Sequence, residues 1–158
     1  MLSARVTSNL PLVKKRFNNF FKRFPKIVTM GLEQAGVQLK EIILERTDRG
    51  LDFNKRRFTP YSQAYSEEKG KTVVNLQDTN KMLQSIDSKL RNKNQVQLFF
   101  RSQTEAKKAL FHQKGLGKLP KRTFFKFNLK TEKIIRRSFE QFIKKEIKRL
   151  KIWVREKI

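Results

Sequence analysis

The sequence has no cysteine and only one histidine among its 158 residues. The lack of thiols excludes disulfide scaffolds, thiolate metal sites and cysteine nucleophiles. No stretch approaches the roughly 20 apolar residues that a membrane-spanning helix needs, so we expect no membrane span. Residues 1–30 also lack the continuous apolar core of a secretion signal.

Acidic residues are scarce: 14 Asp and Glu stand against 38 Lys and Arg, a formal net charge of +24. The excess gathers at the two ends of the chain. Residues 1–30 hold seven basic residues and no acid, and residues 114–158 hold sixteen basic residues and four acids. Such a surface attracts nucleic acid, anionic membranes or acidic proteins. A compositional bias toward lysine would decorate solvated faces in the same way.

Phenylalanine is abundant, with 14 copies that can anchor a modest core in one domain. Residues 10–24 place one valine and four phenylalanines at helical spacing between lysines and arginines, which predicts a short basic amphipathic helix. Its apolar side suits packing on the body, on a neighbouring subunit or on a membrane surface. We therefore divide the chain into a basic amphipathic N-terminal extension, residues 1–24, and a single domain, residues 25–158.

The first half of that domain reads as two helices around a loop. Pro25 suits the first turn of a new helix, which continues to about residue 47. Residues 51–74 carry loop chemistry. Asp78 or Thr79 can then cap a helix whose apolar face is Met82, Leu83 and Ile86.

The second half alternates strands and helices. Alternating side chains predict strands over residues 94–101 and 122–128, separated by a short helix that Thr104 caps and Gly115 ends. Residues 131–158 form a long helix with an apolar stripe, flanked by Trp153, and an outer face of Lys and Arg. The predicted fold is α+β: long N- and C-terminal helices packed on a small antiparallel sheet, with short intervening helices.

None of the residues forms an enzyme signature. The single histidine, His112, has its nearest preceding acid seven residues away, at Glu105, and no serine elbow or second histidine accompanies it. The glycines at 115 and 117 follow a helix and precede Pro120, unlike the glycines of a phosphate-binding loop. We expect no catalytic residues, no cofactor and no metal site.

Four sequence blocks occur together in a recognisable order. They are the 58–71 block FTPYSQAYSEEKGK, the 76–86 block LQDTNKMLQSI, then A-x-x-H-Q-x-G and P-x-R-x-F-F. The order resembles the signature of tailed-phage virion morphogenesis proteins, the tail-completion or neck proteins that include the Mu G-like group. Asn80 stands where that family usually has glycine. The matching residues are Pro60, Tyr61, Tyr65, Lys69, Leu76, Thr79, Met82, Ser85, Ile86, Ala109, His112, Gln113, Gly115, Pro120, Arg122, Phe124 and Phe125.

The resemblance implies a structural, non-enzymatic virion protein at the head–tail junction, assembled in the host cytoplasm and needed to join or complete the tail. Its implied partners are further copies of itself in a symmetric ring, other neck, connector or tail proteins, and genomic DNA without sequence preference. The alternative from a different class is a small basic nucleic-acid-binding protein of ribosomal or nucleoid type. A mitochondrial or membrane-surface protein led by residues 10–24 is a third reading. Candidate contacts to DNA or acidic partners are Lys14, Lys15, Arg16, Lys22, Arg23, Arg136, Arg137, Lys144, Lys145, Lys148 and Arg149.

Overall fold

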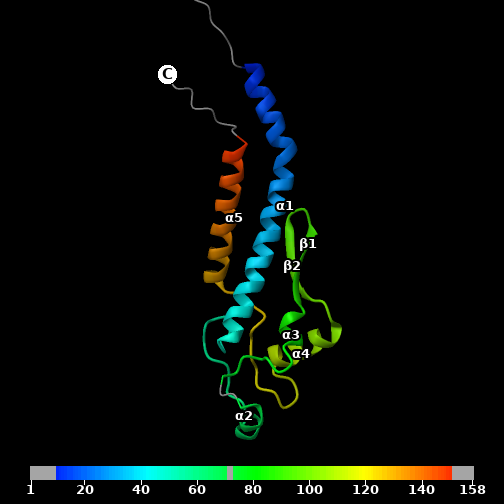
Figure 1. The fold of residues 1–158 in the computed structure, drawn as a ribbon, viewed down its shortest axis with the longest axis vertical. Helices are drawn as coiled ribbons and strands as arrows, with labels where there is room; N and C mark the ends of the chain where they lie inside the picture. The colour runs from blue at the N-terminus through cyan, green and yellow to red at the C-terminus, as the bar shows by residue number, and fades with distance from the viewer. Residues whose placement is uncertain (1–9, 71–72, 151–158) are drawn as a thin grey trace, which may run out of the picture.

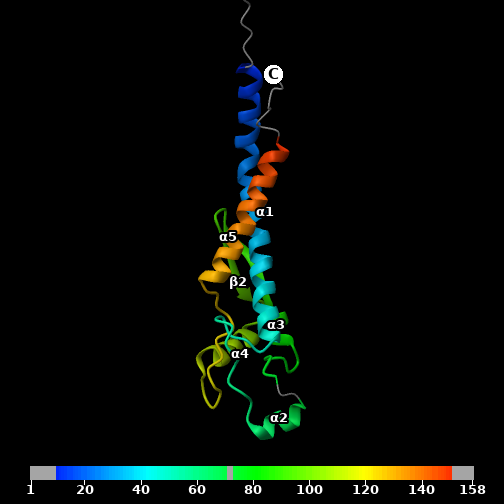
Figure 2. The same ribbon diagram turned by 90° about the vertical axis from the view of Figure 1, so that its left-hand side faces the viewer.

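A computed structural model describes residues 10–70 and 73–150, and it confirms the α+β class. Two long helices run side by side, the short helices gather at the lower end of the molecule, and a β hairpin lies beside the middle of the first long helix (Figures 1 and 2). The predicted helical residues 151–158, with Trp153, lie outside the described residues. The elements are α1 (Leu10–Asp48), α2 (Gln63–Lys69), α3 (Lys81–Gln84), β1 (Ile86–Asn92), β2 (Gln95–Phe100), α4 (Gln103–Lys114) and α5 (Leu129–Arg149).

The predicted helix boundary at Pro25 is wrong, because α1 is one helix of 39 residues with Pro25 inside it. Proline has no N–H to donate to the carbonyl four residues earlier, that of Phe21. Both residues are exposed, so water can take the place of the lost donor. The helical part of the predicted extension is therefore continuous with the helix of the body.

Helix α1 lies between α5, which runs antiparallel to it, and the β hairpin (Figure 1). Two glycines permit this close approach on two sides. A Cβ atom on Gly31 would lie 2.8 Å from Cε2 of Phe139 on α5, and one on Gly36 would lie 2.6 Å from Cγ2 of Val96 on β2. Each glycine weakens the helix by up to about 1 kcal/mol. The close packing of α1 on α5 and on β2, which a larger residue would obstruct, offsets this cost.

The sheet is an antiparallel hairpin of β1 and β2, in which Ile86 pairs with Phe100 and Leu90 with Val96. The prediction of β2 is confirmed, but the placement of Ile86 on a helix is wrong, because Ile86 begins β1. Helix α3 is only four residues long, and Ile86 enters the core from a strand instead. The polar run Asn92–Asn94 between two alternating segments was the available signal for this hairpin.

The predicted strand over residues 122–128 is also wrong, since this segment has no regular secondary structure and joins no sheet. Four of its backbone groups bond to side chains: Arg46 donates to the carbonyls of Phe124 and Lys126, and Gln113 bonds both polar groups of Phe125. These side chains supply hydrogen bonds that a neighbouring strand would otherwise provide.

Helix caps differ in detail from the predicted ones. Ser102, rather than Thr104, caps α4 by accepting a bond from the N–H of Glu105. Neither Asp78 nor Thr79 caps α3: Asn80 occupies that position, with a left-handed φ of 59° and no side-chain cap. Asn80 thus has the left-handed backbone of a glycine turn, which asparagine tolerates better than most residues. Gly115 ends α4 as predicted.

The core sits at the lower end, where the end of α1, the start of β1, α3, α4 and the 122–128 segment meet (Figure 1). The buried hydrophobic cluster is Ile43, Phe58, Val74, Leu76, Met82, Leu83, Ile86, Ala109 and Phe124.

Residues 51–74, predicted as loop, contain a further helix, α2. Ser62 caps this helix by accepting a hydrogen bond from the N–H of Tyr65.

Candidate functional site

The A-x-x-H-Q-x-G and P-x-R-x-F-F blocks form one structural joint. The chain leaves α4, turns and returns along it, so that the N–H of Arg122 donates to the carbonyl of His112 at 2.7 Å. The side chain of Gln113 then acts on both sides of Phe125: its Oε1 accepts the N–H at 3.0 Å and its Nε2 donates to the carbonyl at 3.4 Å. Gln113 thereby fixes the register of the returning segment.

Gly115 is the hinge of this joint, with φ +70° and its N–H donated to the carbonyl of Phe111 at 2.8 Å. A Cβ atom here would lie 2.8 Å from the backbone nitrogen of Lys121. Both the left-handed backbone and the close approach require glycine.

Arg122 ties the joint to the 58–71 block. Its guanidinium donates to the carbonyl of Thr59 at 3.1 and 3.0 Å and to that of Pro60 at 3.1 Å. The same group lies 5.0 Å from the ring centroid of Tyr61, and Nζ of Lys69 lies 4.8 Å from that centroid and 3.1 Å from the Tyr61 hydroxyl. Cations on an aromatic face stabilise such a cluster. Burial lowers the pKa of Arg122, and the nearby tyrosines Tyr61 and Tyr65 act against this shift.

Arg46 completes this framework, and no sequence signal distinguished it from the other basic residues of α1. It is buried, and its guanidinium donates to the carbonyls of Phe124 and Lys126. Desolvation lowers its pKa to about 10, partly opposed by Asp52. A buried carbonyl without a donor is costly. Arg46 therefore stabilises the 122–128 segment by supplying donors that a neighbouring strand would otherwise supply.

The remaining motif residues divide between core and surface. Leu76, Met82, Ile86, Ala109 and Phe124 are buried and belong to the core cluster. Ser85 donates its hydroxyl to the Met82 carbonyl at 2.9 Å, whereas Thr79 is exposed and Pro120 is half-buried. The structure thus brings the four blocks together at the lower end of the molecule.

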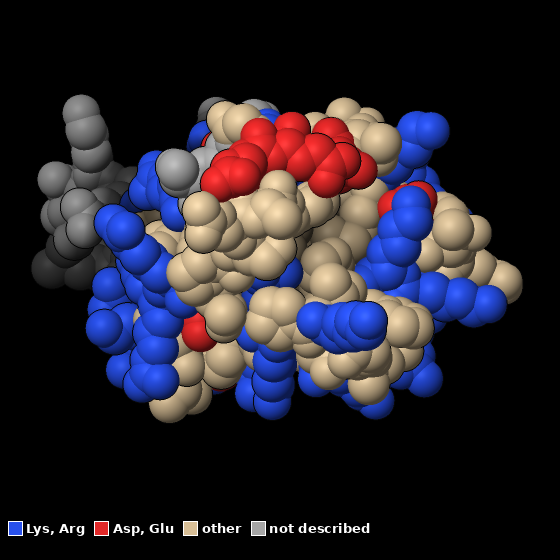
Figure 3. Space-filling view, turned by 90° about the horizontal axis from the view of Figure 1, so that it is seen from below, with Lys and Arg blue, Asp and Glu red and all other residues tan. Residues whose placement is uncertain are grey.

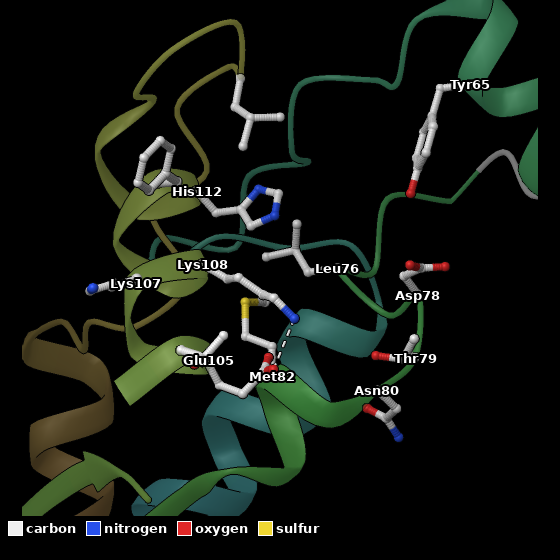
Figure 4. A pocket seen from close by; sticks show the side chains of 13 residues that line it. Tyr65, Leu76, Asp78, Thr79, Asn80, Met82, Glu105, Lys107, Lys108 and His112 are labelled. Atoms are coloured by element: carbon white, nitrogen blue, oxygen red, sulfur yellow. Dashed lines mark hydrogen bonds and ion pairs between the residues drawn. The ribbon is translucent and has the colours of Figure 1, made fainter. Parts of the chain in front are cut away.

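A cleft opens among these residues, between α2, α3, α4 and the loop of residues 116–120. It consists of two neighbouring cavities of about 660 and 440 Å³, which share Tyr65, Leu76, Asp78, His112 and Leu119. Figure 4 shows the larger one, with His112 on α4 and Tyr65, Leu76 and Asp78 facing it from other segments. Leu76 holds a left-handed φ of 56° on this wall, which is strained for a residue of its size.

His112 lies in a desolvated and positively charged part of the cleft. Desolvation, reinforced by Arg122 and Lys69, lowers the pKa of His112 below 6.5. Among the described residues, three side-chain atoms are buried without a hydrogen-bond partner: Nδ1 of His112 and Oε2 of Glu105 in the cleft, and Nε of Arg46 elsewhere. The other oxygen of Glu105 accepts from Lys108 at 2.8 Å. The part of the chain that the structure describes contains no group of three His, Cys, Asp or Glu residues that could hold a metal ion.

The candidate basic contacts lie away from the cleft. Because α1 and α5 are antiparallel, the first half of α1 and the last turns of α5 reach the same, upper end of the molecule (Figures 1 and 2). This places Lys14, Lys15, Arg16, Lys22 and Arg23 at one end with Lys144, Lys145, Lys148 and Arg149. Arg136 and Arg137 are exposed nearer the middle of α5, and Arg136 lies 3.5 Å from Glu132.

Within residues 10–70 and 73–150, none of the helices combines the length and apolar character needed to cross a bilayer. In comparisons with protein-family models, curated proteins and solved structures, nothing matches this chain.

Proposed function

We propose that this chain is a structural virion protein of a tailed phage, acting at the head–tail junction in joining or completing the tail. The observation that carries the proposal is the joint role of the motif residues. Four blocks spread over residues 58–125 meet at the lower end of the molecule, where Gln113 and Arg122 bond to backbone, Gly115 permits a close turn and Phe124 fills the core. Side chains that fix the backbone in this way suit a scaffold protein whose function is assembly.

A ring of identical subunits needs a contact between two different faces of the chain. One face is the first half of α1, where exposed Leu12, Val13 and Phe21 alternate with basic residues and no acid occurs before Glu33. A second face of the same helix holds a cavity of about 370 Å³, lined in part by Met30, Val37, Glu33 and Glu41. We propose that the basic, phenylalanine-bearing half of one copy docks on this acid-flanked face of the next.

Self-assembly is tested by light scattering on the purified, nucleic-acid-free protein at moderate and high salt. We expect a discrete oligomer, and Phe21→Asp should reduce it to the monomer. Leu129→Asp is the matched control, because Leu129 is 74% exposed at the start of α5 and Phe21 is 66% exposed. Equal masses for both variants, or a monomer for the unchanged protein at every salt concentration, would count against the ring contact.

The virion role is tested in the phage itself. Electron microscopy of lysates made without this chain should show filled heads and tails that have not joined, or tails of incomplete form. Normally joined, infectious particles in its absence would refute the role at the junction, whatever the oligomeric state of the purified chain.

A nucleic-acid-binding function is the second candidate, favoured by the basic residues that α1 and α5 bring to one end. A dedicated DNA binder loses affinity steeply with salt, in proportion to the phosphates that it neutralises. Charge reversal at Lys144, Lys145 and Lys148 should then lower both the affinity and the salt slope. The neck proposal expects weak DNA binding without sequence preference.

A further inference from the structure

We infer that the cleft at the lower end binds a partner protein through an extended acidic peptide segment with an aromatic or large aliphatic anchor residue. The cleft would bind such a segment whatever the assembly state of the chain, because it lies at the end opposite the exposed half of α1 (Figure 1). The first ground is size: cavities of about 660 and 440 Å³ that share five lining residues fall in the range of ligand sites, about 300–1,000 Å³.

The second ground is the exposed apolar rim. Tyr65, Phe111 and Leu119 line the cleft and are each more than a third exposed. Large apolar side chains clustered around a concavity mark interaction sites, whereas scattered ones do not. Buried Leu76 and Met82 form the inner wall, so that an anchor side chain would meet apolar surface.

The third ground is charge. Two acidic residues line the cleft, Asp78 and Glu105, and Glu105 is already paired with Lys108. Five basic residues line it: Lys69, Lys107, Lys108, Lys118 and Arg122. With the Lys108–Glu105 pair set aside, four basic residues stand against Asp78 alone. Figure 3 views this end of the molecule from below and shows uncharged surface with Lys and Arg around it, a patch of acidic residues across its upper part and smaller acidic spots at the right and lower left. An acidic segment with an apolar anchor complements this combination, and a basic segment does not.

Glu105 adds a reason to expect a peptide backbone. Its Oε2 is buried without a hydrogen-bond partner among the described residues. A buried acceptor left in this state is costly. A peptide N–H that reached this oxygen would remove the cost, because Glu105 lines the larger cavity.

The loop of residues 116–120 and its neighbours offer two matched pairs of variants. Leu119 lines both cavities and is 38% exposed, while Leu116 lines neither of them and is 37% exposed. Lys118 lines the smaller cavity, and exposed Lys121 lines neither of the two. The cleft variants are therefore Leu119→Asp and Lys118→Glu, with Leu116→Asp and Lys121→Glu as controls.

The probe is a yeast-displayed library of random peptides, panned against the full-length protein, with the enriched peptides then synthesised for titration. We expect enriched peptides rich in Asp and Glu around one aromatic or aliphatic residue. Their affinity should fall about tenfold or more in each cleft variant, as for loss of an interface anchor, and stay unchanged in the controls. Enrichment of neutral or basic peptides, no enrichment beyond that on Leu119→Asp, or equal binding by all four variants would overturn the proposal.

Discussion

Phe124 lies at the centre of the core and is 0% exposed, whereas Phe127 lies three residues later and is 50% exposed. Truncating a fully buried phenylalanine removes its transfer free energy and leaves a cavity, which together cost about 3–5 kcal/mol. Phe124→Ala should therefore lower the free energy of unfolding by about that amount. Phe127→Ala, in the same segment, should cost about 1 kcal/mol or less.

The measurement is urea unfolding followed by far-UV circular dichroism, with the denaturant slope compared between variants. A domain of this kind has about 5–15 kcal/mol of stability, so Phe124→Ala can leave little folded protein. Phe124→Leu is the milder second variant and should fall between the unchanged protein and Phe124→Ala. Losses within about 1 kcal/mol of each other for Phe124→Ala and Phe127→Ala would refute the claim that Phe124 anchors the core.

Two further predictions concern the joint. Gly115→Ala should destabilise the protein more than Gly117→Ala in the same urea assay: both glycines have positive φ, which costs alanine about 1–2 kcal/mol, but only the Cβ at Gly115 meets backbone, 2.8 Å from the nitrogen of Lys121. Equal losses would show that the loop moves aside freely. For His112, the folded pKa lies below 6.5, so the unfolded chain takes up the proton first and stability falls as pH drops below that value. His112→Gln should weaken this fall in stability. Identical profiles of stability against pH for the unchanged protein and His112→Gln would contradict a lowered pKa of His112 in the folded state.

Periodicity and capping determined much of the local structure. The long helices, β2 and the end of α4 at Gly115 were predictable, because each depends on side chains that are neighbours in the sequence. The left-handed turn at Asn80 belongs to the same group. The grouping of the four motif blocks rested on their order alone, and their physical contact through Gln113 and Arg122 became visible only in three dimensions.

Tertiary contacts decided the rest. The 122–128 segment alternates like a strand, yet Arg46 from 78 residues away takes the Phe124 carbonyl and replaces a strand partner. The continuity of α1 through Pro25 depends on exposure at Phe21, and the assignment of Ile86 to a strand depends on its place in the core. The cleft is likewise a product of the fold, because α2, α3, α4 and the following loop must meet before it exists. Local structure depends on residues that are close in the sequence, so the sequence pattern predicts it directly. Contacts between distant segments depend on how all segments pack together around one core, which no local pattern shows.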